Sequence, residues 1–348
     1  MKKKEKGKIA MIKIPHTLEH LDSLAQQHYL YFHKESSIRE VIDDHIDGPM
    51  APLLNYVWVN LEKIIAGRPD VLESMIPALD QHIVESKQNY RNLTPGIIEA
   101  DVTTWFNDII FSIFNYDHNA TSFTKRYEKR LAYGLARTLN ITTCPYCNGQ
   151  FTVTFDVEDG KSRPQFDHFL YKSRYPYFAI SFYNLIPSCY VCNASVKGST
   201  VFSIKTHLHP YLEGMEGAYK FETKISSVDF LVNKKEFDLH LVAREHANPD
   251  HLTRSEGSIE AFAIIDRYQF HKDYASDIIK KAHLYTHTTI KSIIDGFNWE
   301  DNPVFSSPED GLETLMGNFL TEEGLHKRIF SKLSKDVAEE FSVQVNNI

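Results

Sequence analysis

The four cysteines of this 348-residue chain form two pairs with the same C-x-x-C spacing. Cys144 and Cys147 make the first pair, and Cys189 and Cys192 make the second. Such pairs are typical of zinc sites, because each tight turn presents two thiolates to one tetrahedral ion. Four sulfur ligands leave no coordination position for water or substrate. The sequence therefore predicts a structural Zn²⁺ that joins two distant segments, and any chemistry is expected within the stretch from Cys144 to Lys197.

That segment contains residue types that can hydrolyse a phosphodiester. Hydrolysis needs a base that deprotonates water and a cation that neutralises charge on the phosphate. His168 is the candidate base, since an imidazole with an ordinary pKa of ~6.5 is largely neutral near pH 7. Asp167 offers a carboxylate and Asn193 a carbonyl to a hard ion such as Mg²⁺, which prefers oxygen ligands. Adjacent residues at a strand end point to opposite sides, so this dipeptide can serve both roles.

Four more polar residues of the segment are candidate site residues. Asn184 is predicted to hold the loop or the histidine ring by hydrogen bonds. Lys197 is predicted to contact the phosphate, and Lys172 and Arg174 are further candidates for substrate binding. A single histidine is more often structural in a chain with 17 of them, but the position of His168 between the zinc-ligand pairs favours catalysis.

The charge of the chain is unevenly distributed. The formal net charge is −8, yet residues 124–205 carry 11 Lys and Arg against 5 Asp and Glu, which leaves a net −14 on the remainder. A basic segment on an acidic protein concentrates attraction for a polyanion at one place. We therefore expect nucleic acid as the partner, with DNA favoured and RNA possible, because the motif contacts phosphate and not base edges.

Helical periodicity dominates the chain before the cysteines. Helices are predicted from Thr17 onward, over 53–65, over 71–90, over 98–113 and over 122–139. The last of these leads into the first cysteine pair, and its basic residues could hold a nucleic-acid backbone, although a solvated helix face is the alternative. These basic residues are Lys125, Arg126, Lys129, Arg130 and Arg137.

The periodicity changes after the first cysteine pair. Phe151, Val153, Phe155 and Val157 alternate with polar residues, which predicts a half-buried strand. Residues 158–160 predict a hairpin turn, after which the returning strand leads to Asp167 and His168, and a short helix is expected near Asn193.

The remainder of the chain predicts a small sheet near residues 218–245 and further helices. One of these helices begins at Ser307 and Pro308, and a last one occupies most of 321–344. The predicted fold class is α+β. It comprises an N-terminal helical region (1–140), a central module of a hairpin followed by a helix on the zinc-binding cysteine pairs (141–212), and a C-terminal region of small sheet plus helices (213–348).

Residues 140–212 resemble the HNH nucleases of the ββα-metal fold that carry a four-cysteine zinc. The shared features are the two cysteine pairs, Asp167-His168, Asn184-Leu185 and Cys192-Asn193. Within that superfamily the chain is similar to the HNH subunit of Septu-type and retron-associated anti-phage systems. The segments that carry this similarity are Phe166–Leu170, Lys172-Ser173, Tyr175-Pro176, Asn184–Pro187 and Cys192-Asn193, with His209-Pro210-Tyr211 as a less specific feature.

The resemblance implies roles for the site residues and further subunits. Asp167 and Asn193 would bind one catalytic Mg²⁺ or Mn²⁺, His168 would be the base, and Asn184 would orient it. It also implies an ABC-type ATPase partner and, in some systems, a reverse transcriptase with its noncoding RNA. Asn193 departs from the histidine that many HNH proteins have there, which leaves an oxygen ligand, and Tyr171 stands where proline is usual.

Two other functions remain open from the sequence. The chain could be a zinc-stapled nucleic-acid-binding module in which Asp167 and His168 are structural, or an adaptor subunit that tethers a separate catalytic partner through its acidic helical flanks. No apolar run approaches the ~18 to 20 residues of a membrane span. The apolar region after the basic N-terminus is too short for a signal peptide. We expect a cytoplasmic protein, where reduced thiols favour metal over disulfide.

Overall fold

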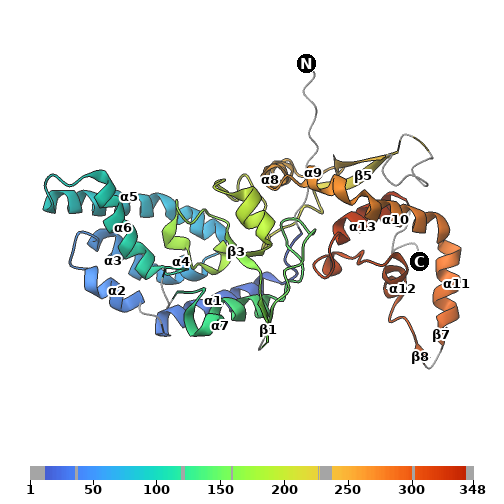
Figure 1. Cartoon of the computed structure of the whole chain (residues 1–348), viewed down its shortest axis with the longest axis horizontal. Helices are drawn as coiled ribbons and strands as arrows, with labels where there is room; N and C mark the ends of the chain where they lie inside the picture. Colours follow the sequence, from blue (N-terminus) through green and yellow to red (C-terminus); the bar gives the residue numbers. More distant parts are fainter. Residues whose placement is uncertain are drawn as a thin grey trace, which may run out of the picture.

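A computed structural model describes residues 12–35, 38–118, 122–157, 160–225, 227, 237–299 and 302–341. The chain is α+β, with many helices and small two-stranded antiparallel sheets. The molecule is elongated, with the first six helices at one end, the last helices at the other, and β3 between them (Figure 1). In this described part, no helix combines the length and the apolar character needed to cross a bilayer.

The N-terminal region is helical, as predicted. A single helix over 53–65 was wrong, because the backbone leaves the helical angles at Asn60, where φ is −109° and ψ is 16°. Pro69 occupies the first turn of the next helix, where a missing N–H costs nothing. The helices are α1 Leu18–Glu35, α2 Ile38–His45, α3 Ala51–Val59, α4 Leu61–Ala66, α5 Pro69–Leu93, α6 Glu99–Ile113 and α7 Arg126–Leu139.

The central region differs from the predicted hairpin. β1 (Phe155–Val157) pairs with β2 (Gly160–Ser162), whereas the strand that carries Asp167 and His168, β3 (Gln165–His168), pairs with β4 (Leu185–Ser188). The two residues of the predicted turn between β1 and β2, 158–159, lie outside the described residues. After β4 comes a short π-helix, η3 (Val191–Lys197), which agrees with the helix expected near Asn193.

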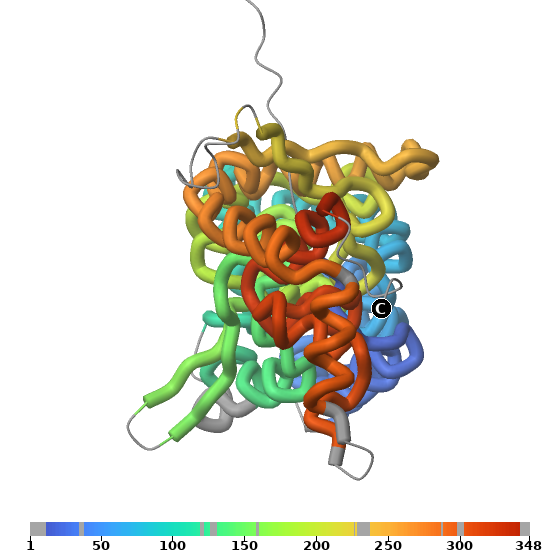
Figure 2. The backbone as a smooth tube through the Cα atoms, turned by 90° about the vertical axis from the view of Figure 1, so that its right-hand side faces the viewer, coloured from blue at the N-terminus to red at the C-terminus, as the bar shows by residue number. Residues whose placement is uncertain are grey.

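The alternating segment 151–157 has the opposite face inward from the one expected. Phe151 is 57% exposed, Phe155 45% and Val157 59%, whereas Thr152 is 4% exposed and Asp156 is half-buried. Only 155–157 form a strand, and the β1–β2 hairpin extends away from the body of the molecule (Figure 2), so its apolar side chains lie outside the core. The alternation was real, but its apolar face is the exposed one.

The C-terminal region contains the predicted sheet, formed by β5 (Tyr219–Ile225) and β6 (Phe237–Ala243). The predicted cap is also present, since the Ser307 hydroxyl accepts a hydrogen bond from the Asp310 amide. A helix over most of 321–344 was wrong, because only η6 and α13 are helical there within the described residues. The elements are α8 Pro249–Ala261, α9 Ile264–Tyr268, η5 Gln269–His271, α10 Lys272–Leu284, α11 His287–Phe297, β7 Asn298–Trp299, β8 Asn302–Pro303, α12 Pro308–Met316, η6 Glu322–Gly324 and α13 Ser331–Glu340.

The hydrophobic core is continuous from the first helices to the last. It runs from Ile14 through the four cysteines to Ala338, so the cysteines lie inside the core. The central segment is thus packed between the two helical ends. The predicted region boundaries at 140 and 212 stay predictions.

Candidate functional site

The four cysteines lie together and are buried. Their sulfur atoms are all within 4.8 Å of one another, and the Sγ atoms of Cys147 and Cys189 are 3.9 Å apart. With Zn–S bonds of about 2.3 Å, a tetrahedral site places its sulfurs about 3.8 Å apart. The four thiols therefore fit a structural zinc ion in both ligand type and spacing.

Each cysteine pair sits on a tight backbone turn. The amides of Cys147 and Asn148 donate to the carbonyl of Cys144, and the amide of Asn193 donates to that of Cys189. The amides of Gly149 and Cys192 also donate to cysteine sulfurs, each at 3.4 Å. Such N–H···S bonds stabilise thiolate charge, as metal ligation requires.

Residues outside the motif complete this cluster. The guanidinium of Arg267 in α9 donates to Cys192 Sγ at 3.4 Å, and the hydroxyl of Tyr268 donates to the Cys147 carbonyl at 2.6 Å. A zinc ion with four thiolates carries a net negative charge, which the Arg267 cation offsets. Sequence reasoning missed both residues, because they lie 75 and 121 positions from their partners.

Asp167 is buried and binds two partners on opposite sides of the motif. The hydroxyl of Tyr146, which stands between Cys144 and Cys147, donates to Asp167 Oδ2 at 2.7 Å. The ammonium of Lys197 lies 2.9 Å from Oδ1 and 2.7 Å from Oδ2. Burial raises the pKa of Tyr146 well above its ordinary value, so the phenol keeps its proton and donates. Lys197 is therefore a buried ion-pair partner, and not an exposed side chain waiting for phosphate.

His168 faces a different set of groups. Its Nε2 lies 2.9 Å from the carbonyl oxygen of Ala179, and the ring of Tyr116 meets it edge-on with centroids 4.5 Å apart. Burial lowers the pKa of His168 to about 4, against an opposing contribution from the Ala179 carbonyl. The imidazole is therefore neutral at physiological pH. Adjacent residues on β3 do serve separate environments, as the strand geometry predicted.

Asn184 holds the loop that joins β3 to β4. Its Oδ1 accepts from the Leu170 amide at 2.6 Å, and its Nδ2 donates to the carbonyls of Leu170 and Phe178. Phe178 precedes Ala179, whose carbonyl binds His168. Two roles were predicted for Asn184, and the structure shows its hydrogen bonds to the loop. Asn184 does not bind the His168 ring directly, but it binds Phe178, the neighbour of the residue whose carbonyl holds that ring.

The other predicted site residues lie around this centre. Asn193 donates from Nδ2 to Gln165 Oε1 at 2.8 Å, which places it against the start of β3. The ammonium of Lys172 donates to both carboxylate oxygens of Asp117. The guanidinium of Arg174 lies 3.3 Å from Asp80 Oδ2, and 60% of the Arg174 side chain is exposed. Among α7 residues, the side chains at 126–130 lie outside the described residues, so the predicted basic face is described only in part.

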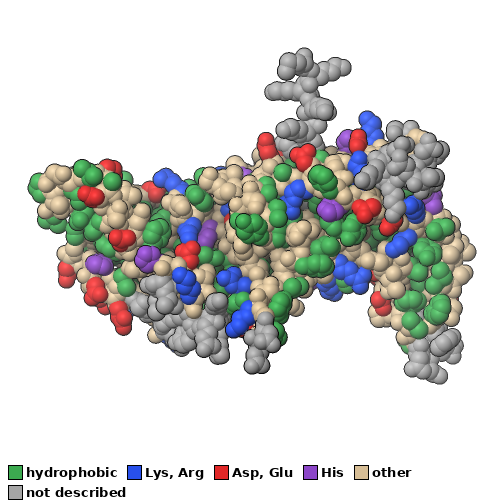
Figure 3. Space-filling view, viewed as in Figure 1, with side chains coloured by type: hydrophobic (Ala, Val, Ile, Leu, Met, Phe, Trp, Pro, Cys, Tyr) green, Lys and Arg blue, Asp and Glu red, His purple; other side chains and the backbone are tan. Residues whose placement is uncertain are grey.

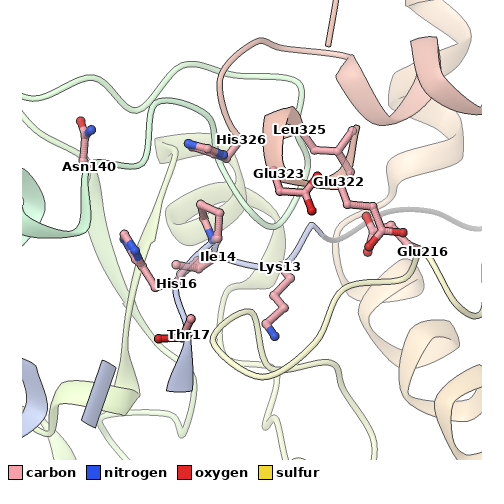
Figure 4. A pocket seen from close by; sticks show the side chains of 11 residues that line it. Lys13, Ile14, His16, Thr17, Asn140, Glu216, Glu322, Glu323, Leu325 and His326 are labelled. Carbon is pink, nitrogen blue, oxygen red and sulfur yellow. The ribbon is translucent and has the colours of Figure 1, made fainter. Parts of the chain in front are cut away.

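A cavity of about 450 Å³ lies elsewhere and contains none of these residues. Figure 4 shows its labelled lining, which comes from the N-terminal segment, from Asn140, from Glu216 and from residues 322–326. Glu216 Oε1 and His326 Nδ1 are buried there without a hydrogen-bond partner among the described residues. Burial raises the pKa of Glu216 to about 7.

No family model, curated protein or solved structure matches the chain.

Proposed function

We propose that this protein is a metal-dependent nuclease of the HNH type, which hydrolyses phosphodiester bonds of nucleic acid with His168 as the general base. The observation that supports this most directly is the bond between His168 Nε2 and the carbonyl oxygen of Ala179. It fixes one tautomer of an imidazole that is neutral at pH 7.

The tautomer follows from the acceptor. A carbonyl oxygen can only accept, so Nε2 must carry the ring proton, and the lone pair then resides on Nδ1. Because burial lowers the pKa of His168 to about 4, protonation does not remove that lone pair in the physiological range. A neutral ring with one fixed nitrogen and one basic nitrogen can take a proton from water.

Basic side chains in the loop that follows His168 can receive the substrate backbone. Lys172 and Arg174 form surface ion pairs with Asp117 and Asp80, and such pairs are weak enough to exchange their carboxylates for phosphates. On the face shown in Figure 3, Lys and Arg side chains gather around the middle of the molecule, while Asp and Glu prevail at the far end of the N-terminal helices. DNA is the favoured polymer, and RNA remains an outcome of the test.

The donor set around Asp167 suits a hard divalent ion. A carboxylate and backbone oxygens surround the Lys197 ammonium, and oxygen is the donor that Mg²⁺ and Mn²⁺ prefer. Asp167, with Asn193 as a second oxygen donor, would hold the ion. When bound, it would neutralise charge that develops on the phosphate.

The biological setting is proposed from the motif resemblance alone. In it the protein is the effector subunit of a cytoplasmic anti-phage complex, together with an ABC-type ATPase and possibly a retron reverse transcriptase with its noncoding RNA. An ATPase step would have to come from another chain, since this sequence has no glycine-rich phosphate loop followed by Lys-Ser/Thr.

The test compares two histidine variants. Wild type, His168→Ala and His28→Ala are incubated with plasmid, single-stranded DNA and tRNA in Mg²⁺ or Mn²⁺, with and without the ATPase. His28 is a matched control, because its Nε2 also binds a carbonyl, that of Ile180 at 2.8 Å, and burial lowers its pKa to about 4. We expect His168→Ala to lose at least about 100-fold in cleavage rate and His28→Ala to retain cleavage.

A specific observation favours a second candidate, a zinc-stapled nucleic-acid-binding module without activity. The carboxylate of Asp167 is already neutralised by a buried ammonium, as a purely structural ion pair would be. In that case every variant binds nucleic acid and none cleaves it. Cleavage that survives in His168→Ala would remove this residue from the mechanism.

A further inference from the structure

The ammonium of Lys197 lies among four oxygen atoms and over the ring of Phe202, whose centroid is 4.6 Å from the nitrogen. Asp167 contributes Oδ1 at 2.9 Å and Oδ2 at 2.7 Å, the carbonyl of His168 makes a short contact, and the carbonyl of Phe169 lies at 3.5 Å. The side chains of Lys197 and Asp167 are 1% and 5% exposed. This is a buried cation site, and the cation is part of the chain.

The site is held in place from several elements. Tyr146 fixes Asp167 from the zinc knuckle, the two carbonyls lie at the end of β3 and just after it, and Lys197 comes from the last position of η3. Gly198 follows with a φ of +53°, and exposed residues continue the chain. The oxygens are thus fixed by the core, whereas the ammonium is on a long side chain at the end of a short helix.

The energetics of such a pair allow exchange. A buried ion pair gains Coulomb energy but loses the hydration of both charges, so its net contribution to stability is small. A divalent ion carries twice the charge of the Lys197 ammonium, so it attracts the Asp167 carboxylate more strongly. It also prefers the same oxygen donors. Removing Lys197 without replacing its charge would be costly, but replacing it with another cation need not be.

We propose that Lys197 is a tethered cation that occupies the divalent-ion site of the resting protein, and that a divalent ion and the Lys197 ammonium bind Asp167 in exchange. The inference deepens the proposed nuclease function and rests on it. When the ion enters, the ammonium leaves the oxygen site and becomes available to the substrate phosphate. Lys197 then occupies the Asp167 site when no divalent ion is bound, and it contacts the substrate phosphate when the ion is bound.

Lysine labelling tests the exchange on the wild-type, zinc-loaded protein. An amine-reactive acetylating reagent is applied with and without Mn²⁺, and modification is quantified by peptide mass spectrometry. Lys332 is the matched control, because it forms a buried ion pair with Asp336, both 0% exposed, and has no contact with Asp167 among the bonds of the described residues. We expect Mn²⁺ to increase acetylation of Lys197 several-fold and to leave Lys332 unchanged. Equal labelling of Lys197 in both conditions overturns the proposal.

Mn²⁺ binding to variants gives a second readout that does not depend on cleavage. Lys197→Met removes the competing charge and should tighten Mn²⁺ binding by about tenfold or more, measured by electron paramagnetic resonance of free Mn²⁺. Lys197→Met/Asp167→Asn should lose this gain. Equal affinities in wild type and Lys197→Met overturn the exchange, and if Lys197→Met fails to fold, the labelling experiment decides. Exchange without cleavage would support the ion exchange at Asp167, and it would overturn the nuclease proposal together with the phosphate contact of Lys197.

Discussion

At the scale of single residues, two buried carboxylates of this protein have opposite surroundings. Asp167 accepts from Tyr146 and pairs with Lys197, so its charge is matched. Glu216 has Oε1 buried without a partner among the described residues, and burial raises the pKa of Glu216 to about 7. Burial therefore favours the protonated form of Glu216, and the stability of the protein should depend on pH through this residue.

Glu216→Gln is predicted to change the pH dependence of stability. Because the folded pKa is raised above the ordinary value of 4.5, folded Glu216 binds its proton more tightly than the unfolded chain does. The stability that this proton contributes is present below pH 4.5 and is lost as pH rises through about 7. At pH 8 we expect the glutamine variant to be more stable than wild type by on the order of 2 kcal/mol, measured by urea denaturation. Near pH 4.5 the difference should disappear, and an equal gain at both pH values would assign it to packing.

The residue types of the candidate site could be predicted from sequence, but their bonding partners could not. The spacing of Cys144 and Cys147 indicated a metal, and the cysteine cluster agrees with it. The ion pair between Asp167 and Lys197 was not visible in the sequence, because a lysine 30 positions away has no local pattern that places it. Tyr146 could have been noticed, since a tyrosine between two zinc ligands is held rigidly.

At the scale of elements, the zinc knuckle, β3 and η3 form one unit. η3 begins at Val191 beside the second cysteine pair and packs against β3, while β3 and β4 pair from Gln165 to His168. β3 is also tied to the first pair through the hydroxyl of Tyr146. None of these elements is long enough to be stable alone, so a metal held by the four cysteines would contribute to their folding energy beside the hydrophobic core.

Removal of zinc by a chelator is predicted to release this unit before the N-terminal helices. Four-ligand zinc sites in small domains contribute on the order of 10 kcal/mol. Hydrogen exchange should therefore accelerate at the amides of residues 165–169 and 185–188, while α3 and α5 serve as controls because they pack on each other. Cys144→Ser and Cys189→Ser should behave like the chelated protein. Unchanged protection in the zinc-free protein would show that the core alone holds the unit.

Elements with a strong periodicity and clear ends were predictable, and elements defined by tertiary contacts were not. α5 and α6 have long apolar stripes and were expected close to their observed bounds. The segment 151–157 has the alternation of a strand, but which face is buried depends on what lies against it. β3 pairs with β4, and the register of this pair depends on the connecting loop that Asn184 holds.

At the scale of the whole molecule, the two cysteine turns, Cys144–Asn148 and Cys189–Cys192, connect segments from both ends of the chain. The amide of Ile12 donates to the carbonyl of Pro145, and α9 contacts the cysteines through Arg267 and Tyr268. Asn148, directly after Cys147, joins the segment 325–332. Its Nδ2 donates to the carbonyls of Leu325 and Arg328, its Oδ1 accepts from the Lys332 amide, and its own carbonyl accepts from the Phe330 amide.

Asn148→Gly is predicted to loosen the C-terminal segment while the zinc site stays intact. Asn148 is fully buried with a φ of +45°, which glycine adopts without strain, so the variant removes only the side-chain bonds. Leaving the Lys332 amide and two carbonyls unpaired should cost about 3 to 5 kcal/mol.

Asn140→Gly is the control, because Asn140 has the same φ of +45° but is exposed. Limited proteolysis should cleave Asn148→Gly within 320–341 faster than the control, at equal zinc content. Equal cleavage rates in the two variants would mean that packing of α13 against α10 and β5 anchors this end of the chain without Asn148.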